Sequence, residues 1–194
     1  MTPKIALFAS GSGSNVENIV RYFAGKKTVD FPLILSNKQD AFVHERAKML
    51  GVPSVTFSRD EFADGRKIVS LLDKYEVDFI VLAGFLLKVS LPILEAYPNK
   101  IINIHPALLP KFGGKGMYGM RVHEAVIAEG DTESGITVHL VNERYDEGSI
   151  IFQTQCPVLP SDTPQTLADR IHQLEYQHYP RVVQRFIEGR QPDF

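Results

Sequence analysis

The sequence predicts one α/β domain with a predominantly parallel, doubly wound sheet of the Rossmann-like type and helices on both faces. Short apolar runs, typical of buried strands, alternate with amphipathic segments through the first two thirds of the 194 residues. A glycine-rich turn joins the first apolar run to the first amphipathic segment. No Ser/Gly/Pro-rich linker or low-complexity stretch interrupts the chain, so we expect residues 1–194 to form a single domain.

The composition is that of an ordinary globular protein. Hydrophobic residues make up 44% of the chain and the mean hydropathy is −0.08. Twenty-one basic and 23 acidic residues give a net charge of −2, which disfavours nucleic acid as the main partner. The one cysteine, Cys156, excludes an internal disulfide and a cysteine-rich zinc site. No apolar run reaches about 18 residues and no signal segment is recognisable, so we expect a cytoplasmic protein that does not bind membranes.

The first half of the chain is predicted to consist of four strand–helix pairs. The apolar runs that predict its strands are Lys4–Ala9, Phe31–Leu35, Val52–Phe57 and Phe79–Ala83. The first helix places Val16, Ile19 and Phe23 on one face, and Ser14 or Asn15 is a reasonable N-cap. The other helices are expected at Ala41–Leu50, which Gly51 closes, at Asp60–Tyr75 and at Leu91–Tyr97.

The second half begins with a fifth strand, Ile101–His105, which ends abruptly at Pro106. A glycine-rich loop, a helix and two strands are expected after it, at Lys111–Met120, Val122–Glu129, Gly135–Val141 and Ser149–Val158. Thr163 followed by Pro164 predicts the start of a long helix that reaches about Gly189. Pro180 should kink or divide that helix. We expect the first five strands to be parallel.

Two polar side chains interrupt the fifth strand. Asn103 and His105 are two residues apart, so in an extended strand they share a face and lie roughly 6.6 Å apart. Burying polar groups is costly unless they find partners. A core histidine with a structural amide beside it is one interpretation. Ligands of parallel α/β sheets bind at the carboxyl ends of the strands, where this pair is expected, and the position favours a functional role.

The segment Gly11–Asn15 follows the first strand and is predicted to bind phosphate. Small residues let backbone N–H groups approach an anion, and the helix that follows adds a favourable dipole. A dinucleotide fingerprint needs glycine at position 16, which is Val16, and the Gly-Lys-Ser/Thr of a P-loop is absent. The pattern therefore favours a phosphate monoester. A tight glycine turn without a ligand is the alternative.

The segment Asn142–Gly148 lies between the last two predicted strands. Asp146 followed by Gly148 is ordinary turn chemistry and is compatible with a plain hairpin. A carboxylate at the active edge of the sheet would also hold His105 in its charged form and raise its pKa. An amide, an imidazolium and a carboxylate together suit a reaction with a tetrahedral oxyanion intermediate.

Residues Ile102–Pro110 (INIHPALLP), with Tyr145–Gly148 (YDEG) downstream, resemble the formyltransferases that use 10-formyltetrahydrofolate. Within that family, Gly11–Asn15 and the chain length are similar to the members that act on phosphoribosylglycinamide in purine synthesis. The resemblance implies that 10-formyltetrahydrofolate, as co-substrate, donates a formyl group directly to the glycine amine. It also implies the formyltransferase fold, small-molecule partners, no metal, and a monomer or weak homodimer.

Roles carried over from the family draw on both halves of the domain. The resemblance implies that about 1–100 binds phosphate, through Gly13, Ser14 and Asn15, and that about 101–194 is the folate and catalytic half. Asn103, His105 and Asp146 would be the catalytic residues. Glu175 would contact the ribose or glycinamide, although a solvated helix carboxylate is its simpler interpretation. The folate would meet Arg66, Leu86, Leu87, Lys88, Val89, Asn103, Asn142 and Tyr145.

Other activities within the family remain as alternatives. Formyltetrahydrofolate deformylase uses water as the formyl acceptor and releases formate. Such enzymes are longer proteins, and they have a second histidine at the position of Pro106. Sugar-nucleotide formyltransferases share the Asn-x-His pattern without needing the phosphate segment. Methionyl-tRNA formyltransferases have a further C-terminal domain and a more basic surface. A non-catalytic phosphosugar-binding protein would leave Asn103, His105 and Asp146 without a joint explanation.

Overall fold

The computed structural model describes residues 2–189, and the chain divides after Asn103 into two compact units. The first unit is Met1–Asn103 and the second is Ile104–Phe194. Each has its own pattern of strands and helices, and the two are described in turn. The predicted α/β class is confirmed.

The first unit is built on parallel strands. Their bounds are β1 Lys4–Phe8, β2 Asp30–Ser36, β3 Ser54–Thr56, β4 Phe79–Leu82 and β5 Ile101–His105, and the last two residues of β5 belong to the second unit. They lie in the order β3-β2-β1-β4-β5, and every pair is parallel, as predicted. The two central strands, β1 and β4, are almost wholly buried because apolar residues line both of their faces.

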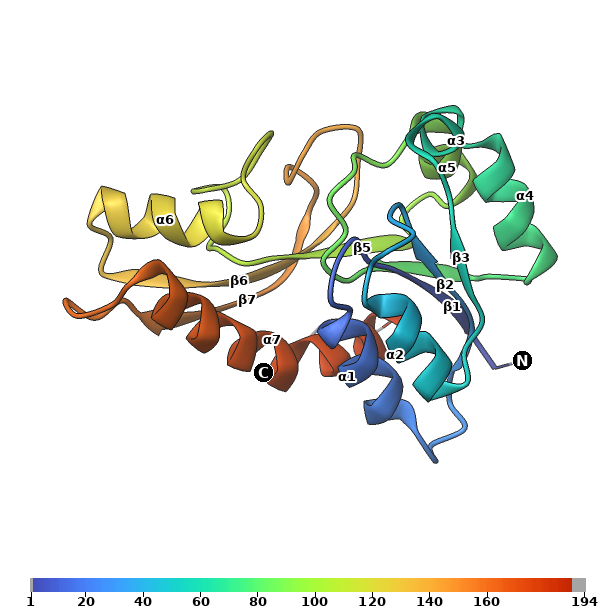
Figure 1. Cartoon of the computed structure of the whole chain (residues 1–194), viewed down its shortest axis with the longest axis horizontal. Coiled ribbons are helices and arrows are strands. Elements are labelled where there is room, and N and C mark those ends of the chain that lie inside the picture. The colour runs from blue at the N-terminus through green and yellow to red at the C-terminus, as the bar shows by residue number, and fades with distance from the viewer. Residues whose placement is uncertain (1, 190–194) are drawn as a thin grey trace. The chain divides into compact units, whose positions relative to one another are not determined.

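Helices cover both faces of this parallel sheet. Their bounds are α1 Ser14–Phe23, α2 Val43–Leu50, α3 Arg59–Asp64, α4 Arg66–Lys74 and α5 Leu91–Ala96. Helices α1 and α2 lie on one face, and α3, α4 and α5 lie on the other (Figure 1). Phe8 of β1 packs against a stacked pair of rings, Phe57 and Phe62, and against the edge of Phe85. This is the doubly wound arrangement predicted from the alternating pattern.

Two local predictions in this unit are wrong. The single helix expected at Asp60–Tyr75 is two helices, because Gly65 adopts a left-handed conformation with φ of 76°. A Cβ at Gly65 would lie 2.6 Å from the Ser90 hydroxyl oxygen, so only glycine fits this close approach. The N-cap of α1 is Gly13, with φ of 73°, instead of Ser14 or Asn15.

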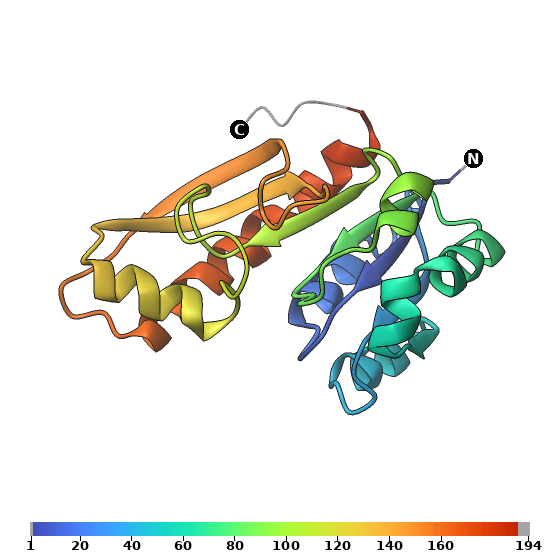
Figure 2. The ribbon, with the colours of Figure 1, turned by 90° about the horizontal axis from the view of Figure 1, so that it is seen from above.

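The second unit is a β-hairpin with two helices. Its elements are α6 Met120–Glu129, β6 Glu133–Leu140, β7 Ile150–Pro157 and α7 Pro164–Ile187. The strands β6 and β7 are antiparallel, and α7 extends along the hairpin (Figure 2), in contact with both strands and with α6. Thr163 caps α7 as predicted. The helix continues through Pro180, so the expected division at that residue does not occur.

No helix within residues 2–189 combines the length and the apolar character that crossing a bilayer demands. The sequence contains no apolar run of that length either.

Candidate active site

The segment Gly11–Asn15 is held in place by contacts with α2. The backbone N–H of Val43 donates to the Gly11 carbonyl at 3.1 Å, and Arg46 Nε donates to the Ser12 carbonyl at 2.8 Å. A Cβ at Gly13 would lie 2.4 Å from Val43 Cγ2. Only glycine therefore allows the loop to lie this close to α2 in its left-handed conformation.

The same segment presents the N-terminus of α1 at the carboxyl end of β1. Ser14 and Asn15 occupy the first turn, where backbone N–H groups have no partner within a helix and the dipole favours an anion. Ser14 is half-buried and Asn15 is buried. The geometry suits a small anion such as a phosphate monoester.

A buried hydroxyl connects three segments of the first unit near these strand ends. Ser10 Oγ donates to Asn37 Oδ1 at 2.6 Å and accepts from the backbone N–H of Leu86 at 3.0 Å. Ser10 thereby fixes the start of the segment Leu86–Val89, in which Leu86 and Lys88 are exposed, Leu87 is half-buried and Val89 is buried. An exposed apolar residue on a fixed backbone suits contact with a ring.

Arg66 lies at the exposed start of α4 and forms a two-point ion pair with Asp64. Its Nε and Nη2 atoms lie 2.6 and 3.0 Å from the two carboxylate oxygens. A folate contact through this guanidinium would have to share it with Asp64.

The polar pair Asn103 and His105 lies at the carboxyl end of β5, the last strand of the parallel set. Asn103 is half-buried and lies opposite Leu82 of β4 in the strand register. His105, two residues later on the same strand, has only 3% of its surface exposed. An imidazole buried this deeply requires polar partners.

Asp146 lies between two histidines of the second unit. Its Oδ2 is 3.6 Å from His105 Nδ1, and its Oδ1 is 3.5 Å from His139 Nε2. The other ring nitrogen of each histidine donates to a backbone carbonyl: His105 Nε2–H to Phe112 and His139 Nδ1–H to Leu140, both at 2.8 Å. Because those protons are committed to carbonyls, the nitrogens that face Asp146 attract the carboxylate only when a second proton is present.

The charges of this cluster oppose the effect of burial. Burial lowers the pKa of His105, while the Asp146 charge and the Phe112 hydrogen bond raise it, and the net pKa is below the ordinary value. Asp146 therefore acts in the predicted direction, but the expectation of a raised pKa is wrong because desolvation is larger. For Asp146, burial raises the pKa, but contacts with His139, His105 and Gly114 outweigh it and the net pKa is lowered.

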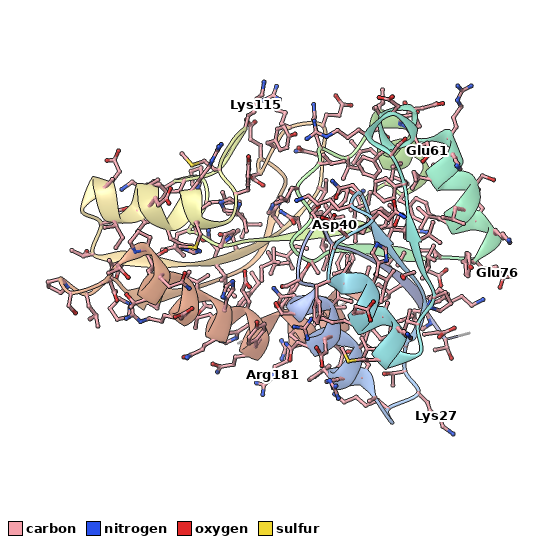
Figure 3. The ribbon with its side chains drawn as sticks, in the orientation of Figure 1. Lys27, Asp40, Glu61, Glu76, Lys115 and Arg181 are labelled. Carbon is pink, nitrogen blue, oxygen red and sulfur yellow. The ribbon has the colours of Figure 1, made fainter. Side chains whose placement is uncertain are left out.

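The glycine-rich loop Lys111–Met120 contacts both members of the His105–Asp146 pair. Phe112 supplies the carbonyl that accepts from His105, and Gly114 N–H donates to Asp146 Oδ2 at 2.9 Å. Phe112 and Asp146 have φ of 57° and 56° and are the only non-glycine residues of Ile104–Gly189 with positive φ. Both of these hydrogen bonds use the backbone of the loop, and Lys115 is exposed and points outward (Figure 3). Left-handed backbone at such positions is typical of functional sites.

Sequence reasoning missed two members of this cluster, His139 and the carbonyl of Phe112. His139 is 2% exposed and follows Thr137 at the same two-residue spacing that singled out Asn103 and His105. That alternation on a buried strand was the available signal. The Phe112 carbonyl left no signal, because a backbone contact depends on the conformation of an irregular loop.

The remaining predicted residues differ in their surroundings. Asn142 and Tyr145 are exposed in the turn between β6 and β7, and the Asn142 side chain accepts from the Arg144 N–H. Glu175 is only 6% exposed, so its interpretation as a solvated carboxylate is wrong. One turn later on α7, Tyr179 is fully buried, and burial together with the Glu175 charge raises its pKa well above the ordinary value.

Within residues 2–189, neither a metal site nor a nucleophilic cysteine gains support. No group of three or more His, Cys, Asp or Glu side chains in this part of the chain is arranged to hold a metal ion. Cys156 is buried, and burial raises the pKa of its thiol, which disfavours the nucleophilic thiolate.

The effect of burial on the pKa of His123, in the first turn of α6, can be tested through the pH dependence of protein stability. Burial, with smaller contributions from His172 and His105, lowers its pKa to about 4 from an ordinary value of 6.5. Below pH 6.5 His123 is protonated in the unfolded chain, whereas in the folded state it stays neutral until about pH 4. The free energy of unfolding therefore falls as the pH decreases. We expect His123 to lower the free energy of unfolding by about 2 kcal/mol at pH 5 relative to pH 8. Urea unfolding of His123→Leu at both pH values should show a correspondingly smaller loss, and an unchanged loss would contradict a neutral buried imidazole.

Comparisons with known proteins agree on one family. A family model described as formyl transferase matches residues 3–183. A chloroplastic phosphoribosylglycinamide formyltransferase of Arabidopsis thaliana is 42% identical over 193 residues, 96% of this chain and 66% of that protein. Its counterpart from Haemophilus influenzae is 36% identical, over 96% of this chain and 88% of that protein. The chain thus spans about two thirds of the plant relative's length.

A solved structure shares the fold along nearly the whole chain. The crystal structure of phosphoribosylglycinamide formyltransferase from Streptococcus pneumoniae superposes with a TM-score of 0.85 at 39% identity. The match covers 95% of this chain and 99% of that one.

Proposed function

The chain belongs to the formyl transferase family, and we propose that it transfers the formyl group of 10-formyltetrahydrofolate to the glycine amine of phosphoribosylglycinamide. Its relatives are named for this activity. The observation that carries the proposal is the buried His105 paired with Asp146 at the end of β5, in a chain whose first helix begins at a glycine turn suited to phosphate. The product would be formylglycinamide ribonucleotide, an intermediate of purine synthesis.

The proposed reaction is direct, without a formyl–enzyme intermediate. The amine nitrogen attacks the formyl carbon, and the carbonyl oxygen becomes the oxyanion of a tetrahedral intermediate. The Asn103 amide and protonated His105 donate to that oxyanion, and each such donor contributes roughly 3–4 kcal/mol. The bond from the formyl carbon to N10 of the folate then breaks, while a proton lost by the amine is delivered to N10.

Asp146 is proposed to stabilise the imidazolium of His105 and to relay that proton. Its carboxylate lies within 3.6 Å of the His105 ring and raises the pKa of His105 against the effect of burial. The lowered pKa of Asp146 keeps it ionised at neutral pH. His139, on its other side, acts on the reaction through Asp146 and is therefore a positioning residue.

Each substrate is proposed to contact residues from both halves of the chain. Gly13, Ser14 and Asn15 hold the phosphate through the first turn of α1. Glu175, buried on α7, contacts the ribose or the glycinamide. The exposed side chain of Leu86, on a segment whose backbone Ser10 fixes, contacts the folate. The other proposed folate contacts are Arg66, Leu87, Lys88, Val89, Asn103, Asn142 and Tyr145.

The proposal extends to the setting of the protein. A chain with this activity uses small-molecule substrates, and we place it in the cytoplasm as a monomer or weak homodimer. Neither nucleic acid nor a membrane is among the proposed partners, in keeping with a net charge of −2.

One assay separates this function from its alternatives. Purified protein is given 10-formyltetrahydrofolate with phosphoribosylglycinamide, with an amino-sugar nucleotide, or with water alone, and tetrahydrofolate release is followed. We expect turnover that depends on phosphoribosylglycinamide. Equal turnover in water alone would indicate a deformylase, and turnover only with the sugar nucleotide would indicate that specificity. No turnover with any acceptor, but binding of phosphoribosylglycinamide, would indicate a non-catalytic binding protein.

A further inference from the structure

A buried hydroxyl on β6 fixes the loop that follows His105. Thr137 has no exposed surface, and its Oγ1 donates to the Ala107 carbonyl at 2.6 Å and accepts from the Leu109 N–H at 3.0 Å. Gln153 of β7 donates from Nε2 to Thr137 Oγ1 at 2.8 Å and to the Leu109 carbonyl at 2.9 Å. The hydroxyl thus uses its one proton and both lone pairs, and both backbone polar groups of Leu109 are bonded.

The packing beneath this loop is equally close. A Cβ at Gly135, two residues before Thr137 on β6, would lie 2.6 Å from Leu108 Cδ2 and 2.1 Å from the Thr154 carbonyl. Glycine therefore lets the loop rest directly on the strand. The segment Ala107–Leu109 is held by this packing and by three hydrogen bonds, and a fourth joins Gln153 to Thr137.

The residues that follow this anchored segment make the contacts that orient the catalytic pair. Phe112, three residues after Leu109, accepts the proton of His105 Nε2. Gly114 donates to Asp146. A Cβ at Gly113 would lie 2.5 Å from Leu109 Cδ2 and 3.3 Å from Asp146 Cβ, so Gly113 lies between the anchored residue and the carboxylate.

We propose that Thr137 and Gln153 are positioning residues of the formyl transfer reaction, which anchor the loop Pro106–Gly114 so that its backbone orients His105 and Asp146. This inference rests on the proposed function. The anchor fixes the Phe112 carbonyl, the carbonyl directs the His105 proton to Nε2, and Nδ1 is thereby turned to Asp146. Neither Thr137 nor Gln153 contacts the His105 or Asp146 side chain in the hydrogen bonds described, so the effect is transmitted by the loop.

The test removes the hydroxyl of Thr137 while nearly keeping the volume of the side chain. Thr137→Val replaces the hydroxyl by a methyl group, and Thr137→Ser restores the hydroxyl. Thr154→Val, on the facing strand β7 opposite Ile136, is the matched control. Steady-state kinetics with 10-formyltetrahydrofolate and phosphoribosylglycinamide is measured from pH 5 to pH 9. Titration of the His105 ring is followed by NMR of ¹⁵N-histidine protein, with His105→Gln identifying the signal.

We expect Thr137→Val to lower kcat about tenfold to a hundredfold, the range that a misplacement of about 1 Å in an active site produces. Because the Phe112 hydrogen bond raises the pKa of His105, a loosened loop should lower that pKa and move the alkaline limb of the kcat profile to lower pH. Thr137→Ser and Thr154→Val should both stay within about threefold of the wild type. A purely structural role would change thermal stability without moving the titration of His105.

Two outcomes would contradict the proposed positioning role of Thr137 and Gln153. One is wild-type kcat and wild-type His105 titration in folded Thr137→Val, and the other is failure of Thr137→Ser to restore them. If Thr137→Val does not fold, Gln153→Leu decides: this exposed residue gives up two hydrogen bonds while the Thr137–Leu109 bond remains. We expect it to lower kcat by about threefold to tenfold with the same pH shift, and wild-type values would overturn the anchor.

Failure of the anchor is distinguishable from failure of the proposed function. If the wild-type protein transfers no formyl group to phosphoribosylglycinamide, the function fails, while the NMR titration still decides whether Thr137 controls His105. If the wild type transfers the group and the variants match it, the anchor alone fails.

Discussion

Asp146→Asn is expected to lower kcat for formyl transfer by about a thousandfold while leaving the substrate KM values within about threefold. Asparagine keeps the shape of the side chain but removes the charge that faces both His105 and His139. In the proposed mechanism, the transition state then loses a stabilised imidazolium and the proton relay. Ground-state binding is affected far less, because neither the phosphate segment nor Leu86–Val89 changes.

The pH dependence of the same variant has a defined sign. Burial lowers the pKa of His105, and the Asp146 charge is the largest influence that raises it. Removing that charge lowers the pKa further, so the protonated ring is lost at a lower pH. The alkaline limb of the kcat profile should therefore move to lower pH in Asp146→Asn, measured from pH 5 to pH 9.

The matched control for this variant lies in the same turn. Glu147 is exposed, and its carboxylate pairs with Arg144 at 3.1 Å, so Glu147→Gln removes a charge one residue away without touching either histidine. We expect its kcat to stay within about twofold of the wild type, as for most surface ion pairs. If Asp146→Asn retained wild-type kcat and an unchanged pH profile, the carboxylate would have no role in the reaction.

Gly13→Ala is expected to raise the KM for phosphoribosylglycinamide by about thirtyfold to a hundredfold and to leave the KM for 10-formyltetrahydrofolate nearly unchanged. The new methyl group would lie 2.4 Å from Val43 Cγ2, and φ of 73° is strained for alanine. The loop must move away from α2, which displaces the backbone N–H groups at the start of α1. A phosphate bound there would lose charge-assisted hydrogen bonds worth about 2 to 3 kcal/mol in total.

Gly11→Ala is the matched control for the phosphate segment. No atom lies within 4 Å of a Cβ at Gly11, and its backbone does not have positive φ. We expect its kinetic constants to stay within about threefold of the wild type. The double variant Gly13→Ala/Val43→Ala removes the clash but keeps the strained φ, so it should recover part of the KM. A selective rise in the KM for the formyl donor instead would assign this segment to the other substrate.

The parallel part of the fold was predictable because its signals are local. Each strand of the first unit is an apolar run, and the alternation of such runs with amphipathic helices allows few arrangements. The division of the helix at Gly65 was not predictable. An isolated glycine in a helical pattern is compatible with continuation, and what decides here is the close approach of Ser90, a residue 25 positions away.

Members of the candidate site could be singled out from the sequence where polar side chains interrupt an apolar pattern. Asn103 and His105 drew notice for that reason, and Asp146 did so because a carboxylate in the turn before the last strand complements a histidine. His139 had the same kind of signal on β6 but stood outside the family motif. The carbonyl of Phe112 and the anchor at Thr137 depend on loop geometry, which no periodicity encodes. The net pKa of His105 depends on how deeply it is buried, which the sequence indicates only in direction.

The most direct measurement follows the formyl carbon itself. Protein is mixed with 10-formyltetrahydrofolate labelled with ¹³C in the formyl group and with phosphoribosylglycinamide, in a single turnover, and products are analysed by mass spectrometry. The account predicts that the label appears in formylglycinamide ribonucleotide at the rate at which tetrahydrofolate forms, with none on the protein at any time. Label released as formate, or label found covalently on the protein before product appears, would contradict direct formyl transfer to phosphoribosylglycinamide.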